Sequence, residues 1–343
     1  GTILKNERAG FLAALLYSLS IYTSIIAGLF VLPDSPQMVF FCASIYLMVK
    51  WTAKPHWFTS LDWIALGLCI GLATLSKVHG LYLWAGFGAF LIFHQSTTFK
   101  KPYLYISGII TLLCLIPIVY WNIENDFITY RYHSERVTHT GIRFDTLLQQ
   151  IVGEWIYQNP IVYIICLIPF FRFDRTQAAF QNKESIRLLL WLSIPLILTF
   201  WIISLFNPTL PHWTGPGFIS LFLIAGVYWE HWSSQVWPSL FKWAMGLLLV
   251  FIVGFISLVY LFPTQLGSKE AANLGEYNPI NDVSGWSEFK GHFEALVAQD
   301  IQSNKMPSGA PILTQKWFPG GHILFYVAQP LHMPVIAVGK LED

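Results

Sequence analysis

Charged side chains are scarce in this chain of 343 residues, because aspartate, glutamate, lysine and arginine together make up only 11% of it. An ordinary soluble domain carries about a quarter charged residues, so the composition excludes that class of protein. Hydrophobic residues reach 55%, and the mean hydropathy is +0.53. This balance indicates a protein built for a lipid bilayer.

Excess positive charge and paired cysteines are also missing. The net charge of +1 comes with no basic patch, which excludes a nucleic-acid-binding surface. The four cysteines (Cys42, Cys69, Cys114 and Cys166) lie inside apolar stretches, without the paired spacing of metal or redox motifs. They indicate small apolar side chains in helix packing.

Nine apolar stretches fill residues 10–262. A membrane-spanning helix needs roughly 20 mainly apolar residues, and lipid does not tolerate open sheet edges. The sequence therefore predicts an all-α, multi-span membrane bundle with about nine spans over residues 1–262. The expected stretches are Gly10–Val31, Ser35–Lys50, Leu61–Ser76, Gly80–His94, Tyr103–Trp121, Pro160–Phe171 with its upstream turn, Leu188–Phe206, Gly215–Trp229 and Leu240–Phe262.

The distribution of basic residues predicts the orientation of these spans, because cytoplasmic loops are enriched in lysine and arginine. With the N-terminus inside, the inner connections hold eleven basic residues and the outer ones hold four. The tail that follows the ninth span then lies on the outer face. The inner set is Lys5, Arg8, Lys50, Lys54, Lys100, Lys101, Arg172, Arg175, Lys183, Arg187 and Lys242, and the outer set is Lys77, Arg131, Arg136 and Arg143.

Residues 263–343 have a more polar composition and predict a small α/β unit outside the membrane. Apolar residues at helical spacing predict an amphipathic helix. A strand, a second helix and another strand are expected to follow. The corresponding segments are Asp282–Gln302, Pro311–Gln315, a helix opened by Gly320 and Gly321, and Met333–Val338. The two glycines predict a turn from the loop into that helix. The alternative is that their backbone N–H groups bind an anion at the start of the helix.

Polar residues between the spans collect on the outer side. They lie in four gaps: Leu32–Pro36 (LPDSP), Ser76–Gly80 (SKVHG), Trp121–Arg136 and Asn207–Trp213 (NPTLPHW). The gaps on the opposite side are mainly lysine- and arginine-bearing connectors. This asymmetry predicts one working face.

The first two gaps each offer a charged candidate. Ser35 and Pro36 are typical of a helix N-cap and first helical position, which places Asp34 just before a positive helix end. Asp34 either supports this helix start or orients an acceptor hydroxyl, a metal ion or a basic partner. Lys77, next to His79, either snorkels to lipid headgroups or offers a counter-charge to a phosphate at the membrane surface.

The other two gaps are longer and less specific. Asn122, His133 and Arg136 lie in the long gap, where most polar residues are solvated loop groups, but arginine suits bidentate phosphate recognition. No standard metal-ligand spacing occurs there. His212 and Trp213 are framed by prolines that can fix a re-entrant turn, although a tryptophan at this depth is also typical of the aromatic belt.

The ordered motifs resemble bacterial members of the protein-mannosyltransferase-like family, to which the lipid A aminoarabinose transferase is related. These are glycosyltransferases of the GT-C type that depend on polyprenyl-phosphate sugars. The resemblance rests on LPDSP, on Gly71–Leu83 (GLATLSKVHGLYL), on Pro117–Arg136 and on Leu210–Leu221 (LPHWTGPGFISL). DVSGWSEF and HILFYV in the tail extend it over nearly the whole chain.

The resemblance implies transfer of a sugar from an undecaprenyl-type phosphate carrier to an acceptor on the periplasmic face of the inner membrane. The family's catalytic base is an acidic residue in a first outer loop, which we expect to precede Gly1 in a longer protein. Asp34 matches a Pro-Asp position with a supporting catalytic role, and His212 is the second catalytic candidate. Lys77, Arg136 and His212 are the candidates for stabilising the departing phosphate, while His79, Asn122, His133 and Trp213 are candidates for substrate binding.

Two other functions remain open at this point. A lipid-linked-sugar flippase or transporter would place ionisable residues deep within helices, and the charges noted above lie at span ends. A non-catalytic lipid-binding subunit is the third reading. No cofactor is indicated with certainty, a divalent metal stays open, and the sequence does not define the sugar, the acceptor (a glycolipid, polymer or protein) or the oligomeric state.

Overall fold

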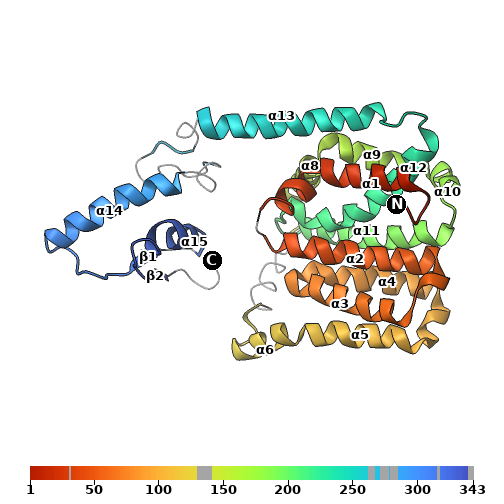
Figure 1. Cartoon of the computed structure of the whole chain (residues 1–343), viewed down its shortest axis with the longest axis horizontal. Coiled ribbons are helices and arrows are strands. Elements are labelled where there is room, and N and C mark those ends of the chain that lie inside the picture. The colour runs from red at the N-terminus through yellow and green to blue at the C-terminus, as the bar shows by residue number, and fades with distance from the viewer. Residues whose placement is uncertain are drawn as a thin grey trace. The chain divides into compact units, whose positions relative to one another are not determined.

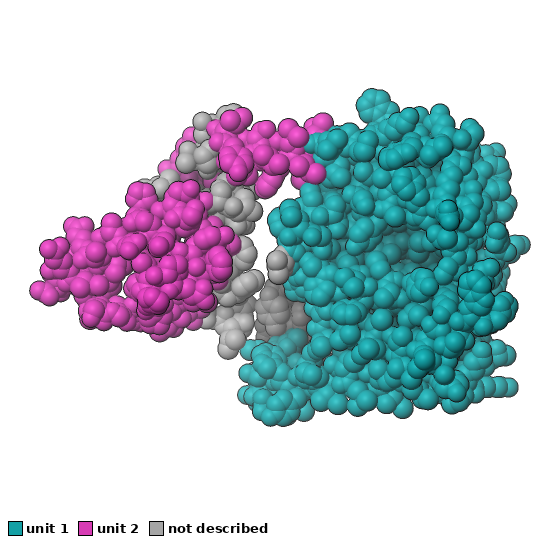
Figure 2. All heavy atoms as spheres, in the orientation of Figure 1, with its two compact units in different colours: residues 1–249 teal, residues 250–343 magenta. Residues whose placement is uncertain are grey.

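The computed structural model describes residues 1–30, 32–129, 141–261, 267–270, 278, 285–314 and 317–338, with the backbone alone for 317–319. The chain folds as two compact units, residues 1–249 and 250–343 (Figure 2). The expected domain boundary near residue 262 stays a prediction.

Unit 1 is a bundle of helices. Helix α3 packs against α2 and α5, α1 packs against α12, and α11 packs against α4 and α12 (Figure 1). Its core is filled by fully buried side chains such as Phe41, Phe87, Phe90 and Phe222. The helices are α1 (Glu7–Leu19), α2 (Asp34–Ala53), α3 (Ser60–Ser76), α4 (Leu81–His94), α5 (Pro102–Cys114), α6 (Ile116–Glu124), α8 (Phe144–Tyr157), α9 (Pro160–Phe171), α10 (Phe173–Ala179), α11 (Lys183–Ser204), α12 (Phe218–Trp232) and α13 (Ser239–Leu261), which continues into unit 2.

Short helical turns fill several connections of unit 1. The π-helical turn η1 (Tyr22–Ile26) follows α1, and the 3-10 turns are η2 (Pro55–Trp57), η3 (Val78–Gly80), η4 (Ser96–Lys100) and η5 (Pro211–Gly217). The predicted all-α bundle is therefore confirmed, and the strands of the described chain occur only in its C-terminal unit.

Among the described residues, three helical segments are long and apolar enough to cross a membrane: Pro102–Glu124, Lys183–Ser204 and Ser239–Leu261. The pair α8 and α9 passes the same test as one span bent by 103°. All nine predicted stretches correspond to helices, but α1 and α12 have only 13 and 15 residues. The number of spans stays a prediction.

The predicted N-cap of α2 is wrong by two residues. The helix begins at Asp34 with Pro33 as its N-cap, and Ser35 lies in its first turn. The Ser35 hydroxyl donates to the Phe30 carbonyl oxygen at 2.6 Å, so it does not cap the helix. Asp34 is buried, which already distinguishes it from an ordinary exposed helix-start carboxylate.

Helix α8 lies between the fifth and sixth predicted stretches, where the sequence predicted no span. Its buried side chains are Thr146, Gln150 and Glu154, which recur every four residues and therefore share one helix face. Apolar residues such as Leu148 and Val152 are exposed instead. This polar-inward arrangement is the reverse of a soluble amphipathic helix, and it explains why a search for long apolar runs missed α8.

The break between α8 and α9 is fixed by side chains. Asn159 adopts a φ of 64° and donates from Nδ2 to the carbonyl oxygens of Leu19 at 3.1 Å and Ala244 at 2.9 Å. Gln158 accepts a bond from the Ser20 hydroxyl at 2.9 Å. These hydrogen bonds connect the break between α8 and α9 to the end of α1 and to α13.

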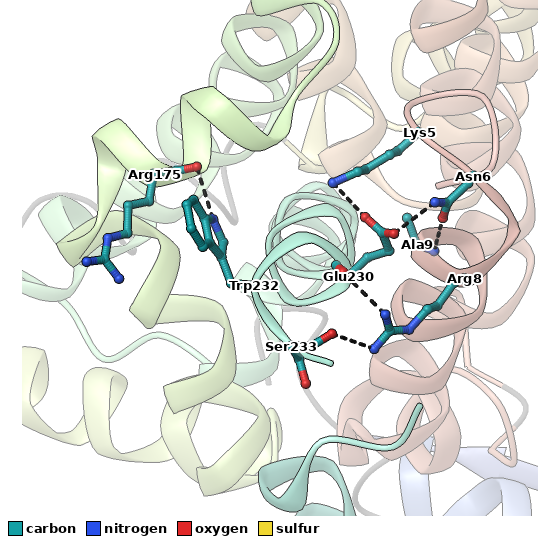
Figure 3. A network of polar contacts seen from close by, with 8 residues as sticks. All are labelled: Lys5, Asn6, Arg8, Ala9, Arg175, Glu230, Trp232 and Ser233. Carbon is teal, nitrogen blue, oxygen red and sulfur yellow. Dashed lines mark hydrogen bonds and ion pairs between the residues drawn. The ribbon is translucent and has the colours of Figure 1, made fainter. Parts of the chain in front are cut away.

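Opposite-charge pairs join the helix ends that the sequence placed on the inner side. Glu230 at the end of α12 pairs with Lys5 at 2.6 Å and accepts from Asn6 at 2.9 Å (Figure 3). Arg8 donates to the Ser233 carbonyl oxygen at 2.8 Å. These contacts close the connections around α1 and α12, while the orientation of the bundle in the membrane stays a prediction.

Unit 2 contains α14 (Trp286–Gln302), β1 (Ile312–Thr314), α15 (Trp317–Ile323), the π-helical turn η7 (Leu324–Ala328) and β2 (Val335–Ala337). The two strands are parallel, with Ile312 opposite Val335. The predicted helix start at Gly320 is wrong, because α15 begins at Trp317. Gly320 instead lets the helix approach Thr314, whose Oγ1 would lie 2.9 Å from an added Cβ.

We expect Gly67→Ala to destabilise unit 1, because a Cβ there would lie 2.3 Å from the Ser107 carbonyl oxygen of α5. Such overpacking costs about 1–3 kcal/mol. Gly108→Ala is the matched control, since nothing lies within 4 Å of its added Cβ, and it should be neutral or slightly stabilising. Thermal unfolding in detergent compares the two, and equal stability of both variants would contradict this packing.

Candidate functional site

Three connections that are distant in the sequence meet at one end of unit 1. They are the α1–α2 connection with Tyr22 and Asp34, the α3–α4 connection with Lys77 and His79, and the α11–α12 connection containing η5. Side-chain contacts join each connection to another, as described below. Three of the four polar gaps therefore converge as the sequence predicted.

The centre of this site is an ion pair between Asp34 and Lys77. Lys77 Nζ lies 2.9 Å from Asp34 Oδ1 and 2.8 Å from Oδ2. The Asp34 side chain is 4% exposed, and the Lys77 side chain is 17% exposed. Because the lysine donates to both oxygens and is shielded from water, the reading of Lys77 as a side chain snorkelling to lipid headgroups does not fit the geometry.

Tyr22 completes the environment of Asp34, and the sequence analysis missed it. Its hydroxyl donates to Asp34 Oδ1 at 2.8 Å, and its side chain is fully buried in η1. The ring packs so closely on Gly215 that an added Cβ would lie 2.3 Å from Cε1. A tyrosine inside an apolar run carries no motif, so only its polar end, which needs a partner when buried, could have drawn attention.

Gln37 is a second residue that the sequence analysis missed. It is fully buried one turn after Asp34, and its Nε2 donates to the Lys77 carbonyl oxygen at 3.1 Å. Asp34 and Gln37 thus hold the side chain and the backbone of Lys77 from the same helix. The three-residue spacing in DSPQ is the only sequence signal for this arrangement.

His79 and Trp213 are brought together around Phe200 of α11. The His79 ring is buried and stacks on Phe200 at a centroid distance of 4.9 Å, and Trp213 lies 6.0 Å from His79. Trp213 therefore packs within the bundle as well as near its surface. The contacts bring these two candidates together but do not assign them a ligand, so their role in substrate binding stays a prediction.

His212 lies beside the ion pair, between two tyrosine rings. Its ring stacks with Tyr22 at a centroid distance of 6.5 Å and lies 5.8 Å from Tyr157 of α8. Burial lowers the pKa of His212 to about 4, the positive charge of Lys77 acts in the same direction, and Asp34 opposes it. His212 is therefore neutral near pH 7 and suited to hydrogen bonding rather than to supplying positive charge.

The remaining predicted residues are not assembled with this group. Asn122 lies in α6, where its Nδ2 donates to the Ile118 carbonyl oxygen at 2.9 Å. His133 and Arg136 lie outside the described residues. Within the part of the chain that is described, no group of three or more His, Cys, Asp or Glu side chains could hold a metal ion, and metal dependence stays open.

Removing one member of the ion pair should cost more stability than removing both. We expect Asp34→Asn and Lys77→Met to destabilise unit 1 by about 3–5 kcal/mol each, because each leaves a buried charge without its partner. The double variant should recover much of this loss. A double-mutant cycle of thermal unfolding in detergent measures the coupling, and additive losses would contradict a coupled buried pair.

The lowered pKa of His212 predicts a pH-dependent stability. Its unfolded pKa of 6.5 exceeds the folded value of about 4, so the unfolded state takes up more protons between these values. The contribution of His212 is complete above pH 6.5 and is lost as the pH falls towards 4. His212→Gln should flatten the decline of stability over this window, whereas an unchanged pH profile would contradict a buried, neutral His212.

Comparison with known proteins gives one match. No curated protein and no solved structure matches the chain. Residues 2–121, which include Tyr22, Asp34, Lys77 and His79, match the family model described as dolichyl-phosphate-mannose-protein mannosyltransferase. This match makes residues 2–121 similar to a family of membrane glycosyltransferases, and the long apolar helices are typical of a multi-pass membrane protein. The predicted resemblance to the protein-mannosyltransferase-like glycosyltransferases is thereby confirmed, and the family is matched by residues 2–121 of the chain.

Proposed function

We propose that the protein transfers a sugar from a polyprenyl-phosphate carrier to a hydroxyl or phosphate acceptor on the periplasmic face of the bacterial inner membrane. The observation that carries this proposal is the buried Asp34–Lys77 pair, which lies where three connections of the bundle meet. Both residues fall within the segment matched by the glycosyltransferase family.

Lys77 is suited to bind the phosphate of the lipid carrier. An ammonium group has three N–H donors, and the bonds given for Lys77 in the described structure occupy two of them on Asp34. A third donor is then available to a phosphate oxygen. When the sugar–phosphate bond breaks, the phosphate gains negative charge, and a preorganised cation lowers the energy of that transition state.

Asp34 fits the supporting role better than that of a base. It accepts three hydrogen bonds, two from Lys77 and one from Tyr22, and its side chain is only 4% exposed. A carboxylate with those oxygens already engaged holds Lys77 in place. We assign the general base to no residue of this chain.

His212 is the second group that we place next to the reacting phosphate or acceptor. As a neutral imidazole it can donate one hydrogen bond and accept another. In the proposed step, an acceptor oxygen attacks the anomeric carbon, the carbon–oxygen bond to the phosphate breaks, and the lipid phosphate leaves with the bonding electrons. Where the acceptor is a hydroxyl, its proton passes to the departing phosphate. Lys77 and His212 stabilise the departing phosphate.

The bias of basic residues supports the outward direction of this site. Eleven lysines and arginines lie in the connections at the other side, against four in the outer gaps, as expected when the Lys77 end faces away from the cytoplasm. His133 and Arg136 belong to the same gap of the sequence as Asn122 and are retained as candidates for substrate binding.

A lipid-linked-sugar flippase is the second candidate function, because of Glu154. This carboxylate is fully buried within the bent pair of helices α8 and α9, and an ionisable residue inside a span is typical of a transport path. Vesicles that contain the full-length protein and a labelled polyprenyl-phosphate sugar distinguish the functions. Sugar found on an acceptor supports the transferase, and lipid moved between leaflets without transfer supports the flippase.

The double variant Asp34→Asn with Lys77→Met should fold and yet lose sugar transfer, because it removes the cation without leaving a buried charge. We expect kcat to fall by about 10²–10³-fold, as for loss of one charge-stabilising donor. The measurement is transfer of labelled sugar from a polyprenyl-phosphate donor by the full-length protein.

The matched control is Lys50→Met with Asp62→Asn, which removes a second ion pair of 2.8 Å between α2 and α3. The Lys50 side chain is 19% exposed and the Asp62 side chain is 15% exposed, so this pair is comparable in burial with the Asp34–Lys77 pair. This control should retain transfer. Full activity of the Asp34/Lys77 variant, or equal loss in both, would refute the role of Lys77.

A further inference from the structure

Glu154 is a buried carboxylate that joins four parts of unit 1. Its Oε1 accepts from the Tyr163 hydroxyl of α9 at 3.2 Å, and its Oε2 accepts from Trp201 Nε1 of α11 at 3.0 Å. The side chains of Gln150 in α8 and Thr214 in η5 also interact with it. Every partner that the structure gives this carboxylate is a neutral, hydrogen-bonding side chain.

Burial of Glu154 costs free energy, because it removes a carboxyl group from water. A buried polar group costs free energy unless hydrogen bonds replace its hydration, and the two oxygens of this carboxyl group each accept one such bond. These bonds fix the positions of their donors. The donors around Glu154 belong to separate helices, so the carboxylate fixes these helices relative to one another.

The part of greatest interest is the short helix η5, because it carries His212. Helix α8 holds η5 on both sides of that histidine. Before it, Gln150 Nε2 lies 3.4 Å from the Pro211 carbonyl oxygen, and Gly153 is so close that an added Cβ would lie 2.3 Å from Pro211 Cγ. After it, Thr214 is fully buried and interacts with Glu154.

Helix α8 also contacts the histidine itself. Tyr157 lies one turn after Glu154, and its ring centroid is 5.8 Å from that of His212. The imidazole also stacks with Tyr22, which donates to Asp34. The carboxylate of Glu154 is thus connected, through η5 and Tyr157, to the surroundings of the Asp34–Lys77 pair.

We propose that Glu154 is a positioning residue, which acts through η5 to hold His212 against the Asp34–Lys77 site. This inference rests on the proposed transferase function for its kinetic consequence, but the positioning itself does not. A carboxyl group is used because its two oxygens accept separately from Tyr163 of α9 and Trp201 of α11, which an amide cannot do with its single oxygen.

Two variants disturb this contact, and the first of them keeps the size of the side chain. Glu154→Gln keeps the shape of the side chain but turns one acceptor oxygen into an N–H donor that faces other donors. Trp201→Phe removes one donor and leaves the carboxylate in place, so it serves if Glu154→Gln fails to fold. Glu230→Gln is the control, because Glu230 is a carboxylate of α12 that pairs with Lys5.

The first readout does not depend on activity. In protein labelled with [15N]histidine, the His212 ring resonance is identified by its loss in His212→Gln. We expect this resonance to shift in Glu154→Gln, to shift less in Trp201→Phe and to stay unchanged in Glu230→Gln. A folded Glu154 or Trp201 variant with an unchanged His212 resonance would overturn the proposal, whether or not the protein transfers sugar.

The second readout is kinetic and links the contact to catalysis. Glu154→Gln should lower kcat by about 10–100-fold, as expected for a small misplacement of a catalytic group, and leave the KM for the lipid donor within about twofold. In the His212→Ala background the same change should have little further effect. Multiplicative losses in the double variant would show that Glu154 acts independently of His212 and would also overturn the proposal.

Discussion

A buried ion pair between Asp34 and Lys77 is the constraint on which the rest of the site depends. Neither charge tolerates burial alone, so the two connections that carry them must stay together. Tyr22 and Gln37 add bonds to the carboxylate and to the lysine backbone, respectively. The α1–α2 and α3–α4 connections are therefore fixed before any substrate arrives, as electrostatic stabilisation of a leaving group requires.

The third connection contributes η5 to the surroundings of this pair. Helix η5 is held by α8 and carries His212 next to Tyr22, which donates to Asp34. Small residues make these approaches close, since Gly215 accommodates the Tyr22 ring and Gly153 accommodates Pro211. The site is thus built by packing between distant segments rather than by one local motif.

The sequence predicted the helical bundle and the convergence of three polar gaps because both follow from long apolar runs with polar ends. It could not predict α8, whose polar residues face inward and whose apolar residues face outward, since a hydropathy scan reads that mixture as a loop. For the same reason Glu154 escaped notice, although Gln150 and Glu154 at a four-residue spacing in QQIVGE were a usable signal. Tyr22 and Gln37 acquire their roles only through distant partners, which no local pattern encodes.

The central claim is that Lys77, held by Asp34, contacts the phosphate of a lipid-linked donor. Solid-state NMR with 15N-labelled lysine and the 31P of a polyprenyl-phosphate sugar tests it directly in membranes that contain the full-length protein. We predict dipolar coupling at hydrogen-bonding distance between Lys77 Nζ and the phosphorus, identified by its loss in the Asp34→Asn, Lys77→Met variant. Bound donor without coupling to Lys77 would contradict the account.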